Sequence, residues 1–201
     1  MIVDGIEVIE RDRPVKLVTL IETSRLFLND SLANDWRIRL DIKQRLETAS
    51  LTLPDGLCLM VYEAFRSRAR QHELWRPMFA KIQSEHPDWT PEQNYTEAAR
   101  WVSPPDGFGS GHQAGAAIDI TLATIDREPL DMGTDMQAFT PLTPTASDVS
   151  AKARQSRDLL VNTLAAQSLI NYPDEWWHFS YGDRLWAEVT GRAQAFYAPI
   201  D

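Results

Sequence analysis

Residues 116–122 constrain the fold more than any other part of this 201-residue chain. Their sequence, AAIDITL, is apolar and contains β-branched side chains, which predicts a buried strand. Asp119 lies near the middle of this run. A carboxylate in a buried strand is costly unless it is hydrogen-bonded, paired with a charge or bound to a metal. The fold must therefore place partners for Asp119 next to this strand.

The rest of the chain mixes strand and helix patterns without a regular strand–helix–strand alternation. The other segments predicted as strands are 15–22, 57–65 and 176–181. The segments predicted as helices are about 40–51, 67–86, 90–101 and 148–170, with a short helix or turn at 183–190 and irregular chain over 103–116 and 124–146. The pattern favours an α+β fold in which helices flank a mostly antiparallel sheet. The length matches a single domain over 1–201.

Composition narrows the function classes. The chain has 20 basic and 29 acidic residues and a net charge of −9, which argues against binding to nucleic acid or to an anionic membrane surface. Cys58 is the only cysteine, so no intramolecular disulfide can form, and its apolar surroundings predict a buried thiol. The N-terminal sequence does not resemble a secretory signal, and no apolar run reaches about 18 residues. We expect a cytoplasmic protein.

The four histidines differ in their sequence surroundings. His72 and His86 lie in a helical segment without a second ligand at a suitable spacing, so we expect them at the surface. His112 lies in the Gly-rich segment 109–115, just before the strand of Asp119. Glycines let such a segment fold back closely, which would bring the imidazole beside the carboxylate. Two interpretations stay open: the two groups form part of a zinc site, or Asp119 accepts hydrogen bonds from the loop backbone.

His178 directly follows Glu175, Trp176 and Trp177, so we expect aromatic rings around its imidazole. In a regular strand Glu175 and His178 would point to opposite faces of the sheet. They meet in one site only if the chain turns near 175–176, a turn that the preceding residues 173–174, Pro-Asp, favour. A Glu beside a metal and water is the general base of zinc hydrolases. The alternative is a packed histidine at a strand end with Glu175 on the surface.

Arg66 follows directly after the largely apolar run 61–65. A cation at the end of a buried strand could polarise a substrate carbonyl or hold a carboxylate with its planar fork of donors. An ion pair with Glu63 or with another acid is the alternative interpretation.

These motifs, taken together, resemble the VanX-type D-alanyl-D-alanine dipeptidases, a family of zinc D,D-peptidases. The matching segments are Tyr62-Glu63-Ala64-Phe65-Arg66, Ser110-Gly111-His112-Gln113-Ala114-Gly115-Ala116-Ala117-Ile118-Asp119, Asp131-Met132-Gly133-Thr134 and Glu175-Trp176-Trp177-His178. The resemblance covers roughly residues 55–190, and we expect residues 1–50 to be an N-terminal extension of the same domain. It implies the fold that these peptidases share with the hedgehog signalling domain.

The resemblance also implies roles for the residues of the metal site. His112, Asp119 and His178 would bind one Zn²⁺ per chain. Glu175 would be the general base that takes a proton from the attacking water and then gives it to the leaving amine.

On the substrate side, the resemblance implies that Arg66 stabilises the oxyanion and that Ser110 and Gln137 lie near the substrate. The chain departs from the family pattern in two places. Ser67 follows Arg66 where the family commonly has proline, and Gln137 stands where dipeptide-specific members carry an aspartate that meets the substrate's amine. A neutral amide pairs with an ammonium group less strongly than a carboxylate does.

These features predict zinc-dependent hydrolysis of D-alanyl-D-alanine or of a similar short D-amino-acid dipeptide. One alternative is a peptidase or carboxypeptidase that acts on another peptide derived from the cell wall. A second is a non-catalytic zinc-binding interaction module, against which the presence of Glu175 and Arg66 argues. The expected partner is a small peptide, and the sequence leaves the oligomeric state open. Residues 1–50 are hypothesised to shield the mouth of the pocket.

Overall fold

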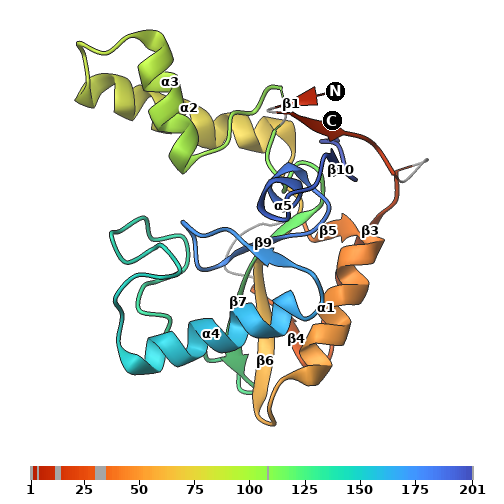
Figure 1. Cartoon of the computed structure of the whole chain (residues 1–201). Coiled ribbons are helices and arrows are strands. Elements are labelled where there is room, and N and C mark those ends of the chain that lie inside the picture. Colours follow the sequence, from red (N-terminus) through yellow and green to blue (C-terminus); the bar gives the residue numbers. More distant parts are fainter. Residues whose placement is uncertain (1, 4, 12–14, 30–34, 108, 201) are drawn as a thin grey trace.

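The computed structural model describes residues 2–3, 5–11, 15–29, 35–107 and 109–200 (Figure 1). Its largest sheet has five strands in the order β4–β6–β7–β9–β8. Their bounds are Leu26–Leu28 (β4), Leu57–Glu63 (β6), Ala117–Thr124 (β7), His178–Ser180 (β9) and Ile170–Asn171 (β8). β4 pairs with β6 in parallel, and the other three pairings are antiparallel. The prediction of a mostly antiparallel sheet is confirmed, and Asp119 lies in its central strand.

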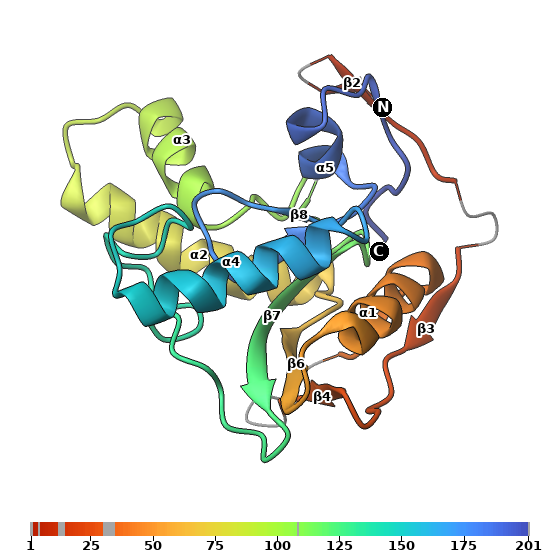
Figure 2. The same ribbon diagram turned by 60° about the horizontal axis from the view of Figure 1, so that its bottom comes forward.

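The helices of the described chain differ in where they lie relative to this sheet. They are α1 (Leu40–Thr52), α2 (Arg68–Glu85), α3 (Pro91–Trp101), α4 (Ala151–Ala165) and α5 (Arg184–Val189). α1 and α4 contact each other over one face of the sheet, whereas α2 and α3 form an arm that extends to the side (Figures 1 and 2). This arrangement confirms the α+β class. Among the described residues, no helix has the length and apolar character that a membrane crossing requires.

Local sequence determines where several helices begin. The side chains of Ser67, Thr90, Ser150 and Asp183 each accept a hydrogen bond from a backbone N–H three residues further on. Gln93 completes a reciprocal capping box with Thr90. Each such cap stabilises its helix by about 1 kcal/mol. The predicted starts of α2 and α3 are therefore confirmed.

Two small sheets attach the N-terminal part of the chain to the rest. β2 (Ile6–Val8) lies between β1 (Ile2–Val3) and β10 (Gln194–Ala195), and β3 (Leu17–Thr19) pairs with β5 (Arg37–Arg39). β2 and β10 are parallel and bring the two ends of the chain together (Figure 1). The main hydrophobic cluster accordingly combines residues from both ends with the sheet, among them Ile6, Ile38, Ile42, Leu160 and Tyr197.

Strand β7 separates the main hydrophobic cluster from the face that carries Asp119. Ile118 and Ile120 are fully buried and belong to that cluster, together with Leu160 of α4. Because successive side chains of a strand point to opposite faces, Asp119 points away from α4. Burial of each isoleucine contributes about 1.5–3 kcal/mol, which stabilises this register.

Several predicted boundaries are wrong. The strand predicted over 15–22 is only Leu17–Thr19. The helix predicted over 148–170 spans Ala151–Ala165, because Ser150 caps its start and a turn with Ser168 at φ 63° follows its end. The strand predicted over 176–181 begins at His178, since turns precede it. Strands β1, β2, β4, β5, β8 and β10 were not predicted, and with two or three residues each they are too short to show an alternating pattern.

Cys58, His72 and His86, which have no expected role in the site, lie as the sequence predicts. Cys58 is fully buried in β6. His72 on α2 and His86 at its C-terminal end are partly exposed, and His86 stacks on Trp89.

Candidate active site

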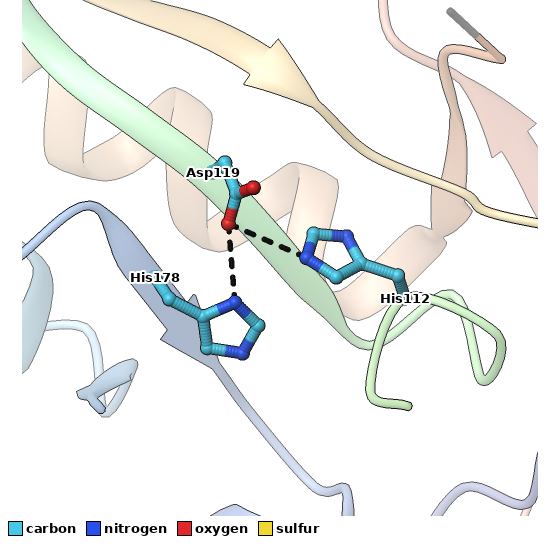
Figure 3. Close-up of side chains that lie close together, drawn as sticks. All are labelled: His112, Asp119 and His178. Carbon is cyan, nitrogen blue, oxygen red and sulfur yellow. Dashed lines mark hydrogen bonds and ion pairs between the residues drawn. The ribbon is translucent and has the colours of Figure 1, made fainter. Parts of the chain in front are cut away.

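Three side chains converge from the central strand, its neighbour and the loop before it (Figure 3). Asp119 on β7 pairs with His178 on β9 in the antiparallel register, and His112 lies in the loop before β7. Asp119 Oδ1 is 3.1 Å from His178 Nδ1 and 3.3 Å from His112 Nε2. Potential ligand atoms of the three residues all lie within 4.8 Å of one another. The structure thus brings together the residues expected as metal ligands.

The surroundings of His112 leave one imidazole nitrogen for a further ligand. Its Nδ1 lies 2.8 Å from the carbonyl oxygen of Ala64, and this hydrogen bond turns Nε2 toward Asp119. Within the described structure, this Nε2 is buried, and its 3.3 Å contact with Asp119 Oδ1 lacks the geometry of a hydrogen bond. A buried polar atom without a partner is costly, and coordination to a metal ion would remove that cost. Two imidazoles and a carboxylate are donors that suit Zn²⁺, so the residues present fit this ion.

Two glycines allow the loop over 109–116 to bring His112 to the strand. A Cβ on Gly111 would lie only 2.1 Å from Asp183 Oδ2, so glycine is required for this close approach. Gly115 has a φ of +64°, a conformation that glycine adopts readily. The carbonyl oxygen of His112 then accepts hydrogen bonds from the backbone N–H groups of Arg66 and Gly115, at 3.2 and 3.0 Å. The predicted folding back of this segment is confirmed.

Asp119 and His178 stabilise each other's charged forms. Burial alone would raise the pKa of Asp119, but the charge of His112, together with the charge and hydrogen bond of His178, outweighs burial and holds that pKa well below its usual range. Burial alone would lower the pKa of His178, but Asp119 outweighs burial and raises it. In the metal-free protein, each of these two groups thus favours the charged form of the other.

Glu175 reaches the same cavity because the chain turns just before β9. The backbone N–H of Glu175 donates to the carbonyl of Tyr172 at 3.1 Å, and the N–H of His178 donates to the carbonyl of Glu175 at 3.3 Å. The turn near 175–176 that would bring Glu175 and His178 into one site is therefore present. Burial raises the pKa of Glu175 to about 7, with a smaller contribution from the charge of Asp119, while His178 and a hydrogen bond from Trp177 oppose the rise. A carboxyl that titrates near neutral pH suits proton transfer.

Arg66 lies just after β6 and lines the same cavity. Its Nε and Nη2 donate to the two oxygens of Glu63 at 2.8 and 2.5 Å, and its Nη1 donates to Gln71 Oε1 at 3.1 Å. The ion pair with Glu63, considered from the sequence, is thus present. Burial alone would lower the pKa of Arg66, but Glu63 outweighs burial and raises it. A guanidinium has five N–H donors, so these contacts leave two for a substrate.

Ser110 and Gln137 also line this cavity. Ser110 Oγ donates to Gln71 Oε1 at 3.2 Å. The side-chain nitrogen of Gln137 donates to Asp119 Oδ2 at 2.9 Å and to Glu63 Oε2 at 3.2 Å. That Ser110 and Gln137 meet the substrate stays a prediction.

Gln71, a buried residue of α2, supports the site and was not predicted from the sequence. Its Nε2 donates to the carbonyl of Ser103 at 2.7 Å, while its Oε1 accepts from Arg66 and Ser110. Gln71 therefore connects the α2 helix to two candidate active-site residues. A buried glutamine in a helix has no local sequence signature, so this role could only be found in the structure.

Asp183 also supports the site and was not predicted from the sequence. It is buried, lines the cavity, caps α5 and accepts a hydrogen bond from Ser180 Oγ at 2.8 Å. Burial raises its pKa. Its position directly before a short helix is typical of a capping aspartate and could have revealed the structural part of its role.

The cavity that holds these residues has a volume of about 1,100 Å³. This volume slightly exceeds the range of about 300–1,000 Å³ typical of small-ligand sites. The candidate metal ligands, Glu175 and Arg66 lie at one part of it, and the α2–α3 arm and α5 form further walls. The described lining residues from the first 50 positions are limited to Val8, so shielding of the mouth by this segment stays a hypothesis.

The comparisons with known proteins agree on one family. The family model described as "D-ala-D-ala dipeptidase" matches residues 38–197, a longer stretch than the resemblance of the motifs alone. The D-alanyl-D-alanine dipeptidase of Synechocystis sp. is 30% identical over 175 residues, covering 75% of this chain and 71% of that protein. The D-alanyl-D-alanine dipeptidase of Escherichia coli K12 is 27% identical over 140 residues, covering 66% of this chain and 60% of that protein.

Two solved structures are also similar to this chain. A Zn(II) complex of a variant of the vancomycin-resistance D,D-pentapeptidase VanY has a TM-score of 0.48 at 19% identity, covering 90% of this chain and 86% of that one. VanYB in complex with D-alanine-D-alanine has a TM-score of 0.48 at 20% identity, covering 89% and 84%. The family match covers most of the chain and includes the candidate metal ligands, Glu175 and Arg66. This chain therefore belongs to the D-alanyl-D-alanine dipeptidase family of M15 peptidases.

Proposed function

We propose that this chain hydrolyses the peptide bond of D-alanyl-D-alanine or of a similar short D-amino-acid dipeptide. The observation that carries the proposal is the convergence of the candidate metal ligands with Glu175 and Arg66 in one cavity. Membership of the family supports the substrate class, since both curated relatives are named D-alanyl-D-alanine dipeptidases.

The metal site would be formed by His112 Nε2, Asp119 Oδ1 and His178 Nδ1, which would hold one Zn²⁺ per chain. Three protein ligands are typical of catalytic zinc sites, whereas structural zinc sites usually have four. When bound, Zn²⁺ would supply Lewis acidity that lowers the pKa of water to about 7 and polarises a carbonyl group. This ligand count, together with Glu175 nearby, favours an enzyme over a non-catalytic zinc-binding module.

Glu175 would move the proton. Its carboxylate would take a proton from the attacking water and then donate it to the nitrogen of the leaving amino acid. The burial that raises its pKa to about 7 makes both directions of transfer accessible near neutral pH.

Arg66 would stabilise the negative charge that develops on the carbonyl oxygen of the scissile bond. Glu63 and Gln71 hold its guanidinium in place before the substrate arrives. Preorganised donors of this kind need no rearrangement during the reaction, and removing one typically costs about 10²–10³ in kcat.

A second candidate function is hydrolysis of a longer peptide derived from the cell wall. The observation in its favour is the volume of the cavity, about 1,100 Å³, which continues along the α2–α3 arm. Trp101 and Phe139 line this part, their ring centres are 6.1 Å apart, and they are 39% and 46% exposed. Aromatic faces at this position could contact residues beyond the scissile dipeptide.

The test compares three substrates on the zinc-loaded protein: D-Ala-D-Ala, L-Ala-L-Ala and an N-acylated tripeptide that ends in D-Ala-D-Ala. Release of free alanine is measured for each, with a chelator as the control. The proposal predicts chelator-sensitive release from D-Ala-D-Ala and much slower release from L-Ala-L-Ala. Faster hydrolysis of the tripeptide would favour the second function, and zinc binding without hydrolysis of any of the three would favour the non-catalytic module.

The cellular setting follows from the proposed substrate. D-Ala-D-Ala is a building block of peptidoglycan, so the enzyme would act on cell-wall precursors or their breakdown products. The cytoplasmic location stays a prediction from the sequence. That the chain acts as one domain is likewise part of the proposal, and the shared core of residues such as Ile6, Ile42 and Tyr197 supports it.

A further inference from the structure

Gln137 lies between two carboxylates, that of the buried Asp119 and that of the partly buried Glu63. It lies in the irregular segment between β7 and α4, and its backbone has a φ of +58°, which is uncommon for any residue other than glycine. Its side-chain nitrogen donates to Asp119 Oδ2 at 2.9 Å and to Glu63 Oε2 at 3.2 Å. One amide group thus contacts carboxylates from two neighbouring strands, β7 and β6.

These contacts assign a separate partner to each oxygen of Asp119. Oδ1 faces the two imidazoles, at 3.1 Å from His178 and 3.3 Å from His112. Oδ2 is held by Gln137. The carboxylate therefore has a fixed rotation, in which Oδ1 is presented to the position between the imidazoles.

The same contacts extend to the other side of the cavity. Glu63 Oε2 accepts from Gln137 and also from Arg66 Nη2. A continuous series of hydrogen bonds therefore runs from Asp119 through Gln137 and Glu63 to Arg66. We propose that Gln137 is a positioning residue that fixes Asp119 for metal binding and couples it to the Glu63–Arg66 ion pair.

The chemistry of the side chain explains why an amide suits this position. A glutamine NH₂ group has two hydrogens, so it can donate to both carboxylates at once. An ionised glutamate would offer only acceptors and would add a third negative charge beside Asp119 and Glu63. An apolar side chain would leave Asp119 Oδ2 without its donor. Partners that orient a metal ligand typically contribute about 10–100-fold to metal affinity.

The test measures the zinc dissociation constant of purified variants by competition with a chromophoric chelator. Gln137→Met keeps an unbranched side chain of similar length but removes the donor, and we expect about a 10–100-fold weaker affinity. Gln137→Asn distinguishes the effect of the side chain from that of the backbone. Asparagine tolerates a positive φ, but its side chain is too short to reach both carboxylates. It should lose affinity like Gln137→Met. Affinity of both variants equal to that of the parent protein would overturn the proposal.

A matched control is Gln93→Met, which removes a side-chain hydrogen bond in the capping box of α3, outside the cavity. It should lower the melting temperature and leave the zinc dissociation constant unchanged. If Gln93→Met weakens zinc binding as much as Gln137→Met does, the effect is general destabilisation and the proposal is wrong.

The coupling is tested with Glu63→Asp, which withdraws the carboxylate by one methylene group. Glu63→Asp should weaken zinc binding when it is made in the parent protein. Made in the Gln137→Met variant, it should cause no further loss of zinc affinity, because the effect of Glu63 on Asp119 passes through Gln137. Additive losses would contradict the coupling.

The kinetic consequence, a lower kcat with a similar KM at saturating zinc, rests on the proposed function. A parent protein that binds zinc without hydrolysing peptides would refute that function and leave the affinity results to decide this inference.

Discussion

Asp119 on β7 and His178 on β9 face each other across an antiparallel strand pair, with Oδ1 and Nδ1 3.1 Å apart. Two of the three candidate metal ligands are therefore positioned by sheet pairing, which also fixes the core on the opposite face of β7. The third, His112, is added by a loop whose glycines allow close packing. Ligands on paired strands are held more rigidly than ligands on loops, which favours a preorganised site.

The first prediction concerns Asp119 as a metal ligand. Asp119→Asn keeps the shape of the side chain but removes the charge that pairs with both imidazoles. Zinc content, measured by atomic absorption after gel filtration, should fall from one equivalent per chain to well below one. Asp106→Asn is the control, because Asp106 forms an exposed ion pair with Arg68. Full zinc content in Asp119→Asn would remove this residue from the ligand set.

The second prediction concerns Glu175 as the proton carrier. Glu175→Gln should retain one zinc per chain, since Glu175 is not among the three grouped ligand residues. Its kcat on D-Ala-D-Ala should fall by about 10²–10⁴, the usual contribution of a positioned general base. Steady-state kinetics and a zinc assay on the same preparation measure both effects. Turnover close to that of the parent protein would show that another group moves the proton.

The third prediction concerns the stability of the zinc-free protein as a function of pH. Burial raises the pKa of Glu175 from 4.5 to about 7, so between these pH values the folded state binds a proton that the unfolded state has lost. The free energy of unfolding contributed by this group must therefore fall as pH rises from about 4.5 to about 7. Glu175→Gln removes this dependence. The free energy of unfolding of the variant, relative to that of the parent protein, should therefore rise by about 3 kcal/mol between pH 4 and pH 8.

Urea denaturation of both zinc-free proteins across this range measures the difference. Other groups titrate in both proteins, so comparing the two isolates the contribution of Glu175. A difference in unfolding free energy that stays constant with pH would show that the pKa of Glu175 is not raised.

The fourth prediction concerns the geometry of Arg66. Arg66→Lys keeps a positive charge near Glu63 but loses the fork that contacts both of its oxygens. We expect kcat to fall by about 10²–10³ with a smaller change in KM. Arg37→Lys is a matched control, because Arg37 makes an exposed two-point contact with Asp35. Equal kinetics for Arg66→Lys and the parent protein would exclude Arg66 from stabilising the oxyanion.

The fifth prediction concerns the close approach of the His112 loop. A Cβ at position 111 would meet Asp183 Oδ2 at 2.1 Å and the Cβ of Ala117 at 2.8 Å. Gly111→Ala should therefore destabilise the protein by about 1–3 kcal/mol, as overpacking does, and also weaken zinc binding. Gly56→Ala is the control, because Gly56 has a φ of +83° but open space around it. It should cost stability without changing zinc affinity.

The sequence predicted the parts of the site that depend on local pattern. Asp119 in an apolar strand had to find partners, the glycines around His112 allowed the loop to fold back, and the Pro-Asp pair at 173–174 allowed Glu175 to turn toward His178. Each of these inferences needed only neighbouring residues and the cost of burying charge.

The supporting contacts could not be predicted, because they join distant parts of the chain. Gln137 reaches Glu63 across 74 positions, and Gln71 reaches Ser110 across 39. Strand β10 likewise depends on pairing with β2, near the other end of the chain. Such contacts depend on the packing of the whole fold and leave no periodic pattern in the sequence.

The central claim is that one metal ion at His112, Asp119 and His178 makes this chain a D-alanyl-D-alanine dipeptidase. The most direct test adds zinc stepwise to the metal-free protein and measures release of D-alanine from D-Ala-D-Ala. We predict that the rate rises in proportion to zinc and stops rising at one equivalent per chain. No release at any zinc level from a protein that binds one equivalent would contradict the claim.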